Sequence, residues 1–252
     1  MVARPPVTTS AASRWGRWLL LLTALAQAAS PALIPFDEGD PSDPVVVPPA
    51  AFFAIWGVIV LGCLAAAAWG FPLVRATRAP WRRVQLRVSL VQVGFVVWLL
   101  AAARVPVLTL PVFVGMLVLL VPSLLAVLGS TTDRATRLLL GGSLGLYTGW
   151  TAAAVWLNAA TLLPALQSGA SGVAPMLGLG ALVLGAVATT SALTKVVRAD
   201  VGYVLAATWA LIGAAVGAAT SEAPALAAVA AAGVITVLLV AIRTRFARPA
   251  SG

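Results

Sequence analysis

The sequence lacks histidine, has one cysteine, and carries charge on only 9% of its 252 residues. Without histidine the chain lacks the commonest metal ligand and the usual side-chain proton shuttle. Cys63 lies in an apolar run, so it cannot form an internal disulfide and is expected to be inert packing. In ordinary soluble domains about a quarter of the residues are charged, so this composition excludes an ordinary soluble domain.

Apolar residues take the place of charge: 61% of the chain is hydrophobic, in unbroken runs that are long enough to cross a bilayer. In lipid every backbone N–H and C=O needs an internal partner, which only helices and closed barrels provide. A barrel would show short alternating strands, which these runs do not resemble. We therefore predict an all-α, polytopic transmembrane bundle of about eight spans, at residues 16–34, 50–74, 88–103, 107–128, 138–163, 173–194, 200–217 and 223–242.

The charges support this topology. Of the 16 basic residues, all except Arg104 fall in alternate loops or in the two tails, and five of the seven acidic residues fall in the intervening loops. The positive-inside rule then places both termini in the cytoplasm. No basic patch is interleaved with aromatic residues, so the net charge of +9 predicts orientation in the lipid bilayer and no nucleic-acid partner. The alanine- and arginine-rich, lysine-poor composition suggests a high-GC bacterium, and hence the cytoplasmic (inner) membrane.

The first span has an alternative interpretation. Residues 14–30 contain arginines, an apolar stretch and a cleavage-like Ala26–Ala28, which together are typical of a signal peptide. Cleavage would leave seven spans and an external N-terminus. The apolar stretch continues through Pro31–Phe36, which favours a retained helix. The tails, 1–12 and 246–252, are predicted to be disordered.

The spans offer little for catalysis. None carries Asp, Glu or Lys at its centre, and we find no paired carboxylates, nucleophile–base pair, phosphate-binding loop or metal-ligand cluster. The sequence therefore predicts a protein that is not an enzyme and has no metal or cofactor site.

Two segments suggest a binding surface. In the first, Pro48 and Pro49 precede a helix on which Phe53 and Trp56 share one face. The second is a helix, one face of which carries two aromatic rings, a small residue and an amide. Such a face suits a flat, mostly apolar ligand. That face consists of Tyr147, Trp150 or Thr151, Ala154 and Asn158.

These segments resemble the TspO/MBR family, the tryptophan-rich sensory proteins related to the translocator protein. The family has a proline-rich loop leading into a Phe…Ile-Trp helix, as in Pro48–Trp56, and a Tyr-x-x-Trp-x-x-x-Ala-x-x-Leu-Asn helix, as in Tyr147–Asn158. Gln92…Trp98 matches more weakly, because Phe95 stands where the family often has Asn.

The resemblance covers residues 16–164, a five-helix core between an N-terminal tail (1–15) and three additional spans (165–243), which it leaves out; residues 244–252 form the second tail. It implies a porphyrin-type ligand held between helices, for sensing or transport. Such a pocket would be lined by Phe53, Trp56, Trp98, Tyr147, Trp150 and Asn158.

Two other functions stay open on the sequence alone. One is a small secondary transporter of other specificity, although the lack of charge inside the spans argues against proton coupling. The other is a membrane scaffold without a small-molecule site. Gly141, Gly145, Gly149 and Ala153 form a small-residue ridge that predicts close helix packing, either within the chain or in a homodimer.

Overall fold

The computed structural model describes residues 11–34, 43–166 and 172–247, and within them it contains helices and no strands. Most of the tails that were predicted to be disordered lie outside the described residues. The helices are α1 (Ala11–Leu33), η1 (Ala50–Ala54), α2 (Ile55–Gly70), α3 (Leu73–Ala76), α4 (Trp81–Arg104), η2 (Pro106–Leu108), α5 (Thr109–Leu128), α6 (Arg134–Thr136), η3 (Arg137–Gly141), α7 (Gly142–Thr161), η4 (Pro164–Leu166), α8 (Val173–Val196), α9 (Val201–Thr220) and α10 (Pro224–Phe246).

Seven helical segments of the described chain are long and apolar enough to cross a membrane, which confirms the polytopic helical bundle. They are 50–70, 81–104, 106–128, 134–161, 173–196, 201–220 and 224–246. The sequence predicted eight. The eighth, α1, has 23 residues but is not apolar enough to be counted.

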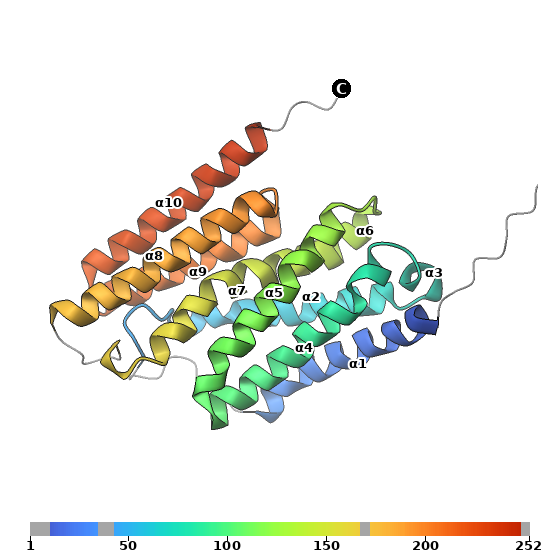
Figure 1. Ribbon diagram of the computed structural model, residues 1–252, viewed down its shortest axis with the longest axis horizontal. Helices are drawn as coiled ribbons and strands as arrows, with labels where there is room; N and C mark the ends of the chain where they lie inside the picture. The colour runs from blue at the N-terminus through green and yellow to red at the C-terminus, as the bar shows by residue number, and fades with distance from the viewer. Residues whose placement is uncertain (1–10, 35–42, 167–171, 248–252) are drawn as a thin grey trace, which may run out of the picture.

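The polar residues of α1 explain the difference. Arg17 and Gln27 lower its mean hydropathy most, and Thr23 and Ser30 lower it slightly, yet the side chains of Thr23, Gln27 and Ser30 are buried against the rest of the bundle. α1 runs along α4 and α2 (Figure 1). A composition average counts these residues as if they faced lipid, whereas the fold turns them inward.

The span predicted at 88–103 is also longer in the structure. α4 begins at Trp81, so Arg82, Arg83 and Arg87, predicted as part of a loop, lie in its first two turns on exposed positions. Long arginine side chains can keep their guanidinium groups in water at the end of a span, so a helix can contain them there.

The first five long helices pack together, and α8–α10 form one bundle with them. α9 lies along α7, and α10 lies along both α8 and α9 (Figure 1). A Cβ at Gly149 would collide with the Tyr203 carbonyl oxygen and lie 3.0 Å from Ala207 N, and one at Gly145 would lie 3.1 Å from Gly202 Cα. Gly145 and Gly149 of the glycine ridge therefore pack within the chain against α9, and Gly141 faces Val127 of α5.

Basic residues gather at one end of this bundle. That end contains the start of α1, the α3–α4 connection, α6, the α8–α9 turn and the end of α10 (Figure 1). The Arg17 guanidinium carbon lies 4.9 Å from the Phe71 ring centroid, and Arg245 Nη2 donates to the Ala199 carbonyl at 3.0 Å. We call this the arginine end. The opposite end contains η1, η2 and η4.

Candidate ligand-binding site

The residues predicted to line a pocket come together in the half of the bundle away from the arginine end. η1 and the first turn of α2 supply Phe53 and Trp56, and the last two turns of α4 supply Trp98. α7 supplies the rest of the set, namely Tyr147, Trp150 and Asn158. Local helix geometry aligns the residues within each segment, and the crossing of α2, α4 and α7 brings the three groups into one cluster.

Trp56 is the centre of this aromatic cluster. Its indole is buried, and its ring centroid lies 5.5 Å from that of Tyr147, 5.8 Å from Trp98 and 6.0 Å from Trp150. The Tyr147 and Trp150 rings meet it edge to face, an arrangement that aromatic quadrupoles favour. Phe53 joins the cluster from its rim, 5.8 Å from Trp150, and is half-buried.

Sequence reasoning missed two members. The Phe95 ring lies 4.8 Å from Trp56, and Phe113 of α5 lies 5.0 Å from Trp98. Phe95 occupies the position where an asparagine was expected from the resemblance, so the chain has another aromatic wall there instead of an amide. Its spacing of three residues from Trp98 was a signal for this role, because residues three apart share a helix face.

Asn158 does not offer the free amide that the sequence suggested. Its Oδ1 accepts a hydrogen bond from Trp98 Nε1 at 3.2 Å, and its Nδ2 donates to the Ala154 carbonyl at 2.8 Å. The Oδ1 bond joins α4 to α7 and the Nδ2 bond lies within α7, so both polar atoms of the amide are paired inside the chain. In this conformation Asn158 positions the Trp98 ring.

The unpaired polar group in the cluster is the indole N–H of Trp150. The side chain is 1% exposed, and its Nε1 has no hydrogen-bond partner. The adjacent Thr151 hydroxyl is also buried and unpaired. A buried donor without a partner costs about 1–3 kcal/mol, so these atoms are suited to a partner that is not part of the chain.

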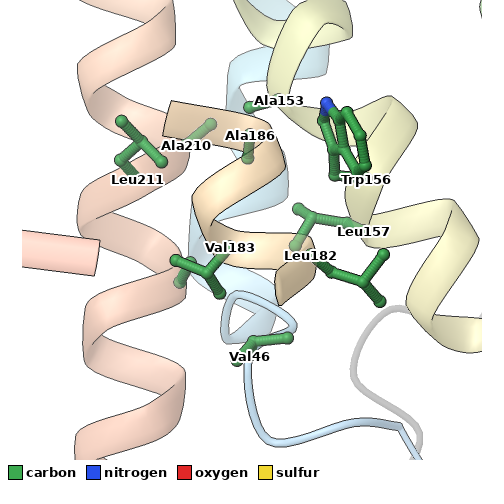
Figure 2. A pocket seen from close by; sticks show the side chains of 10 residues that line it. Val46, Ala153, Trp156, Leu157, Leu182, Val183, Ala186, Ala210 and Leu211 are labelled. Atoms are coloured by element: carbon green, nitrogen blue, oxygen red, sulfur yellow. The ribbon is translucent and has the colours of Figure 1, made fainter. Parts of the chain in front are cut away.

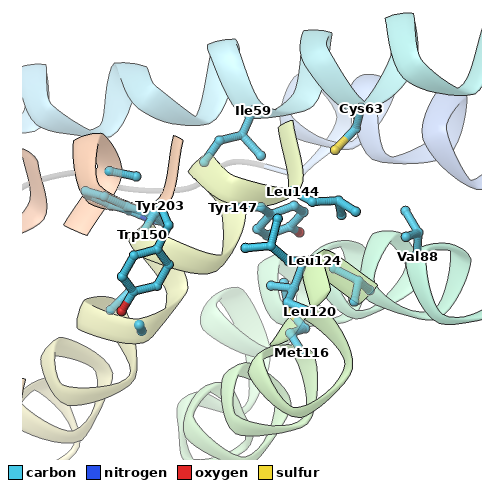
Figure 3. Packing of buried hydrophobic residues seen from close by; sticks show 14 of the residues in the cluster. Ile59, Cys63, Val88, Met116, Leu120, Leu124, Leu144, Tyr147, Trp150 and Tyr203 are labelled. Carbon is cyan, nitrogen blue, oxygen red and sulfur yellow. The ribbon is translucent and has the colours of Figure 1, made fainter. Parts of the chain in front are cut away.

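The rings fill the space between them. A flat ligand sandwiched between two rings needs two van der Waals separations, about 7 Å in total, whereas the Trp56 contacts are 4.8–6.2 Å between centroids. Figure 3 shows Tyr147 and Trp150 packed among the other buried side chains of this core. Insertion of a ligand therefore requires the rings to separate.

A second apolar site lies between α7, α8 and α9. Trp156, Leu182, Val183 and Leu211 are among its lining residues, together with Val46 from the segment before η1 (Figure 2). Its free volume of about 10 Å³ is room for about one water molecule. Trp156 Nε1 donates to Thr189 Oγ1 at 3.0 Å, so this indole is paired, unlike that of Trp150.

Polar side chains adjoin the aromatic cluster on the α1 side of Tyr147. Gln27 Nε2 donates to the Tyr147 hydroxyl at 3.2 Å, and Thr23 Oγ1 donates to Gln92 Oε1 at 2.6 Å. Ser89 lies on the same face of α4 as Gln92 and is 1% exposed. Thr23, Gln27 and Ser89 were not among the residues predicted to line the pocket. The two glutamines could have indicated this polar group from the sequence, because Gln is rare and costly inside an apolar span.

The family described as TSPO-like protein matches residues 36–243, which is most of the chain. This range begins after α1 and includes α8, α9 and α10, which the resemblance read from the sequence left out. Comparisons with curated proteins and with solved structures give no significant match.

Proposed function

The chain belongs to the TSPO-like family, and from that premise we propose that it is a ligand-binding membrane protein for a flat, apolar molecule such as a tetrapyrrole, in sensing or transport. The ligand would lie between α2, α4 and α7. Its faces would stack on the rings around Trp56, as flat ligands do in pockets of mostly apolar and aromatic side chains.

The observation that carries this proposal is the unpaired Nε1 of Trp150 in the middle of the aromatic cluster. A cluster that served packing alone would gain stability by pairing this N–H or by replacing the residue with phenylalanine. A ligand with a hydrogen-bond acceptor would satisfy the donor. Trp150, and not Asn158, then supplies the polar contact, while Asn158 keeps Trp98 in place.

The proposed activity is binding, not catalysis, because the spans carry no acid, base or nucleophile placed for a reaction. We also propose that the protein resides in a bacterial cytoplasmic membrane with the arginine end in the cytoplasm, following the positive-inside rule. The aromatic cluster would then lie nearer the opposite surface. A ligand would reach it from the outer leaflet or from the outer aqueous phase.

The test is a titration of protoporphyrin IX into the purified protein, followed by tryptophan quenching and by the porphyrin absorption band. Trp150→Phe keeps an aromatic ring but removes the N–H, and we expect it to weaken binding. Trp156→Phe is the matched control, since it changes an indole of the same helix outside the cluster. If binding were weaker in Trp156→Phe and unchanged in Trp150→Phe, the binding site would be the one between α7, α8 and α9. Quenching equal to that of empty micelles would reject porphyrin binding.

A further inference from the structure

The polar side chains between α1, α4 and α7 are hydrogen-bonded incompletely. Gln27 and Gln92 are both 0% exposed, yet Gln27 Oε1 and Gln92 Nε2 have no partner. The Ser89 hydroxyl is also buried and unpaired. Buried polar atoms in proteins are paired in the great majority of cases, so several together in one place require a physical reason.

Rotation of the amides does not remove the problem. If Gln27 is turned about its last side-chain bond, Oε1 faces the Tyr147 hydroxyl and Nε2 becomes the unpaired atom. The same exchange at Gln92 places Nε2 on Thr23 Oγ1 and leaves Oε1 free. Each amide therefore uses one polar atom within the chain and has one left, whichever way it is turned.

Tyr147 connects this polar group to the aromatic cluster. Its ring packs edge to face on Trp56, and its hydroxyl is bonded to Gln27. A ligand among the rings of Trp56 and Trp150 would thus have an apolar surface on one side of Tyr147 and unpaired amide atoms on the other. No charged side chain takes part in either group.

We propose that Gln27, Gln92 and Ser89 form a polar subsite that hydrogen-bonds the uncharged donor and acceptor groups of the ligand. This inference rests on the proposed function and adds the class of ligand: a flat apolar molecule with neutral hydrogen-bonding groups at one edge. Amide, hydroxyl and protonated carboxyl groups have this chemistry, since they can serve both an amide oxygen and an amide N–H. An ionised group is disfavoured there because the subsite supplies no opposite charge.

The test removes each internal pair together, so that no new unpaired atom is created. One double variant is Thr23→Val/Gln92→Met and the other is Gln27→Met/Tyr147→Phe, which keeps the ring of Tyr147. The matched control is Gln85→Met, because Gln85 is a buried amide of α4 that also faces α1 but is paired, with Nε2 donating to the Ala76 carbonyl at 3.2 Å.

Two readouts are needed, one without ligand and one with the diamide of protoporphyrin IX as the probe, because its edge groups are uncharged amides that both donate and accept. In the ligand-free protein, we expect both double variants to melt at the wild-type temperature or above, because they remove unpaired buried atoms. The control should melt lower, by roughly 2–4 °C for one lost hydrogen bond. With the probe, each double variant should bind about 2- to 10-fold more weakly, while the control keeps wild-type affinity.

The outcomes separate this inference from the proposed function. Double variants that melt below the wild type, as the control does, would show a purely structural network and overturn the subsite, whether or not porphyrin binds. Porphyrin binding that is sensitive to Trp150→Phe but equal in both double variants would also overturn the subsite, and it would support the aromatic site. Loss of binding in the double variants, with unchanged or raised melting temperatures, supports both.

Discussion

The indole Nε1 of Trp98 donates a hydrogen bond to Oδ1 of Asn158 at 3.2 Å, across 60 residues of chain. This bond joins α4 to α7 beside the aromatic cluster, and it holds the Trp98 ring, whose centroid lies 5.8 Å from that of Trp56 and 5.0 Å from that of Phe113. The pair has therefore a positioning role, which can be separated from ligand contact by experiment.

Asn158→Leu should destabilise the protein, and its effect on the free energy of unfolding should not simply add to that of Trp98→Phe when both residues are replaced. Asn158→Leu removes the acceptor of this bond, whereas Trp98→Phe removes its donor. A double-mutant cycle with Trp98→Phe should give a coupling of about 0.5–1.5 kcal/mol in the free energy of unfolding, in the range measured for hydrogen bonds between membrane helices. Reversible unfolding in mixed micelles provides the measurement. Strictly additive effects would mean that the bond contributes nothing to stability.

The structure also shows what sequence reasoning could reach at this site. Tyr147, Trp150 and Asn158 were predicted to share a face because helical periodicity determines the positions of residues three or four apart. The partner of Asn158 lies on another helix, so only the tertiary packing of α4 on α7 could reveal that the amide is occupied. The contact between Gln27 and Tyr147, 120 residues apart, was beyond local reasoning for the same reason.

The bundle itself was largely predictable, because the need to pair backbone groups in lipid leaves few alternatives to helices. α1 was the exception in the count of apolar spans. Its composition does not reveal that Gln27 points into the bundle, since a hydropathy average has no direction. The packing of α9 on Gly145 and Gly149 was predicted only as close packing of some kind, and the structure identifies the partner as a helix of the same chain.

Gly149→Ala should be strongly destabilising, because the new methyl group would meet backbone atoms of α9, which cannot rotate away. Its Cβ would collide with the Tyr203 carbonyl oxygen and lie 3.0 Å from Ala207 N. Small-to-large changes in packed cores typically cost about 1–3 kcal/mol. Gly142→Ala is the matched control on the same helix, since a Cβ there meets nothing within 4 Å. Thermal unfolding of both variants provides the comparison, and equal melting temperatures would contradict the observed helix contact.

The arginine end should face the cytoplasm. Cys63 is the only cysteine and is buried, so a Cys63→Ala background allows single cysteines to be placed at exposed positions. Arg78→Cys reports on the arginine end and Ser221→Cys on the opposite end. In intact cells a membrane-impermeant maleimide should label Cys at 221, and it should label Cys at 78 only after permeabilisation. The reverse pattern would show that the positive-inside rule fails for this protein.

Asp200 should make the protein less stable as the pH rises. Its carboxylate caps α9, accepting from Tyr203 N–H at 3.0 Å, but burial raises the pKa of Asp200 above its ordinary value, against the opposing effects of backbone N–H groups and the Arg245 charge. At low pH the carboxyl is protonated in both the folded and the unfolded state. As the pH rises through the ordinary value of about 3.9, the unfolded state loses this proton first, so stability falls until the pH exceeds the raised pKa.

Asp200→Asn should therefore stabilise the protein at neutral pH, because asparagine caps a helix as well as aspartate does without burying a charge. The difference from the wild type should shrink as the pH is lowered to about 3. Asp133→Asn provides a control of opposite sign, because hydrogen bonds from the backbone N–H and the hydroxyl of Thr136 lower the pKa of Asp133. The charged form of Asp133 therefore stabilises α6 at pH values above the ordinary carboxyl pKa, and its replacement should destabilise the protein there. The measurement is a set of melting curves of the wild type and both variants from neutral pH down to about pH 3. If Asp200→Asn changed stability equally at both pH values, the cause would lie in packing and not in the ionisation of Asp200.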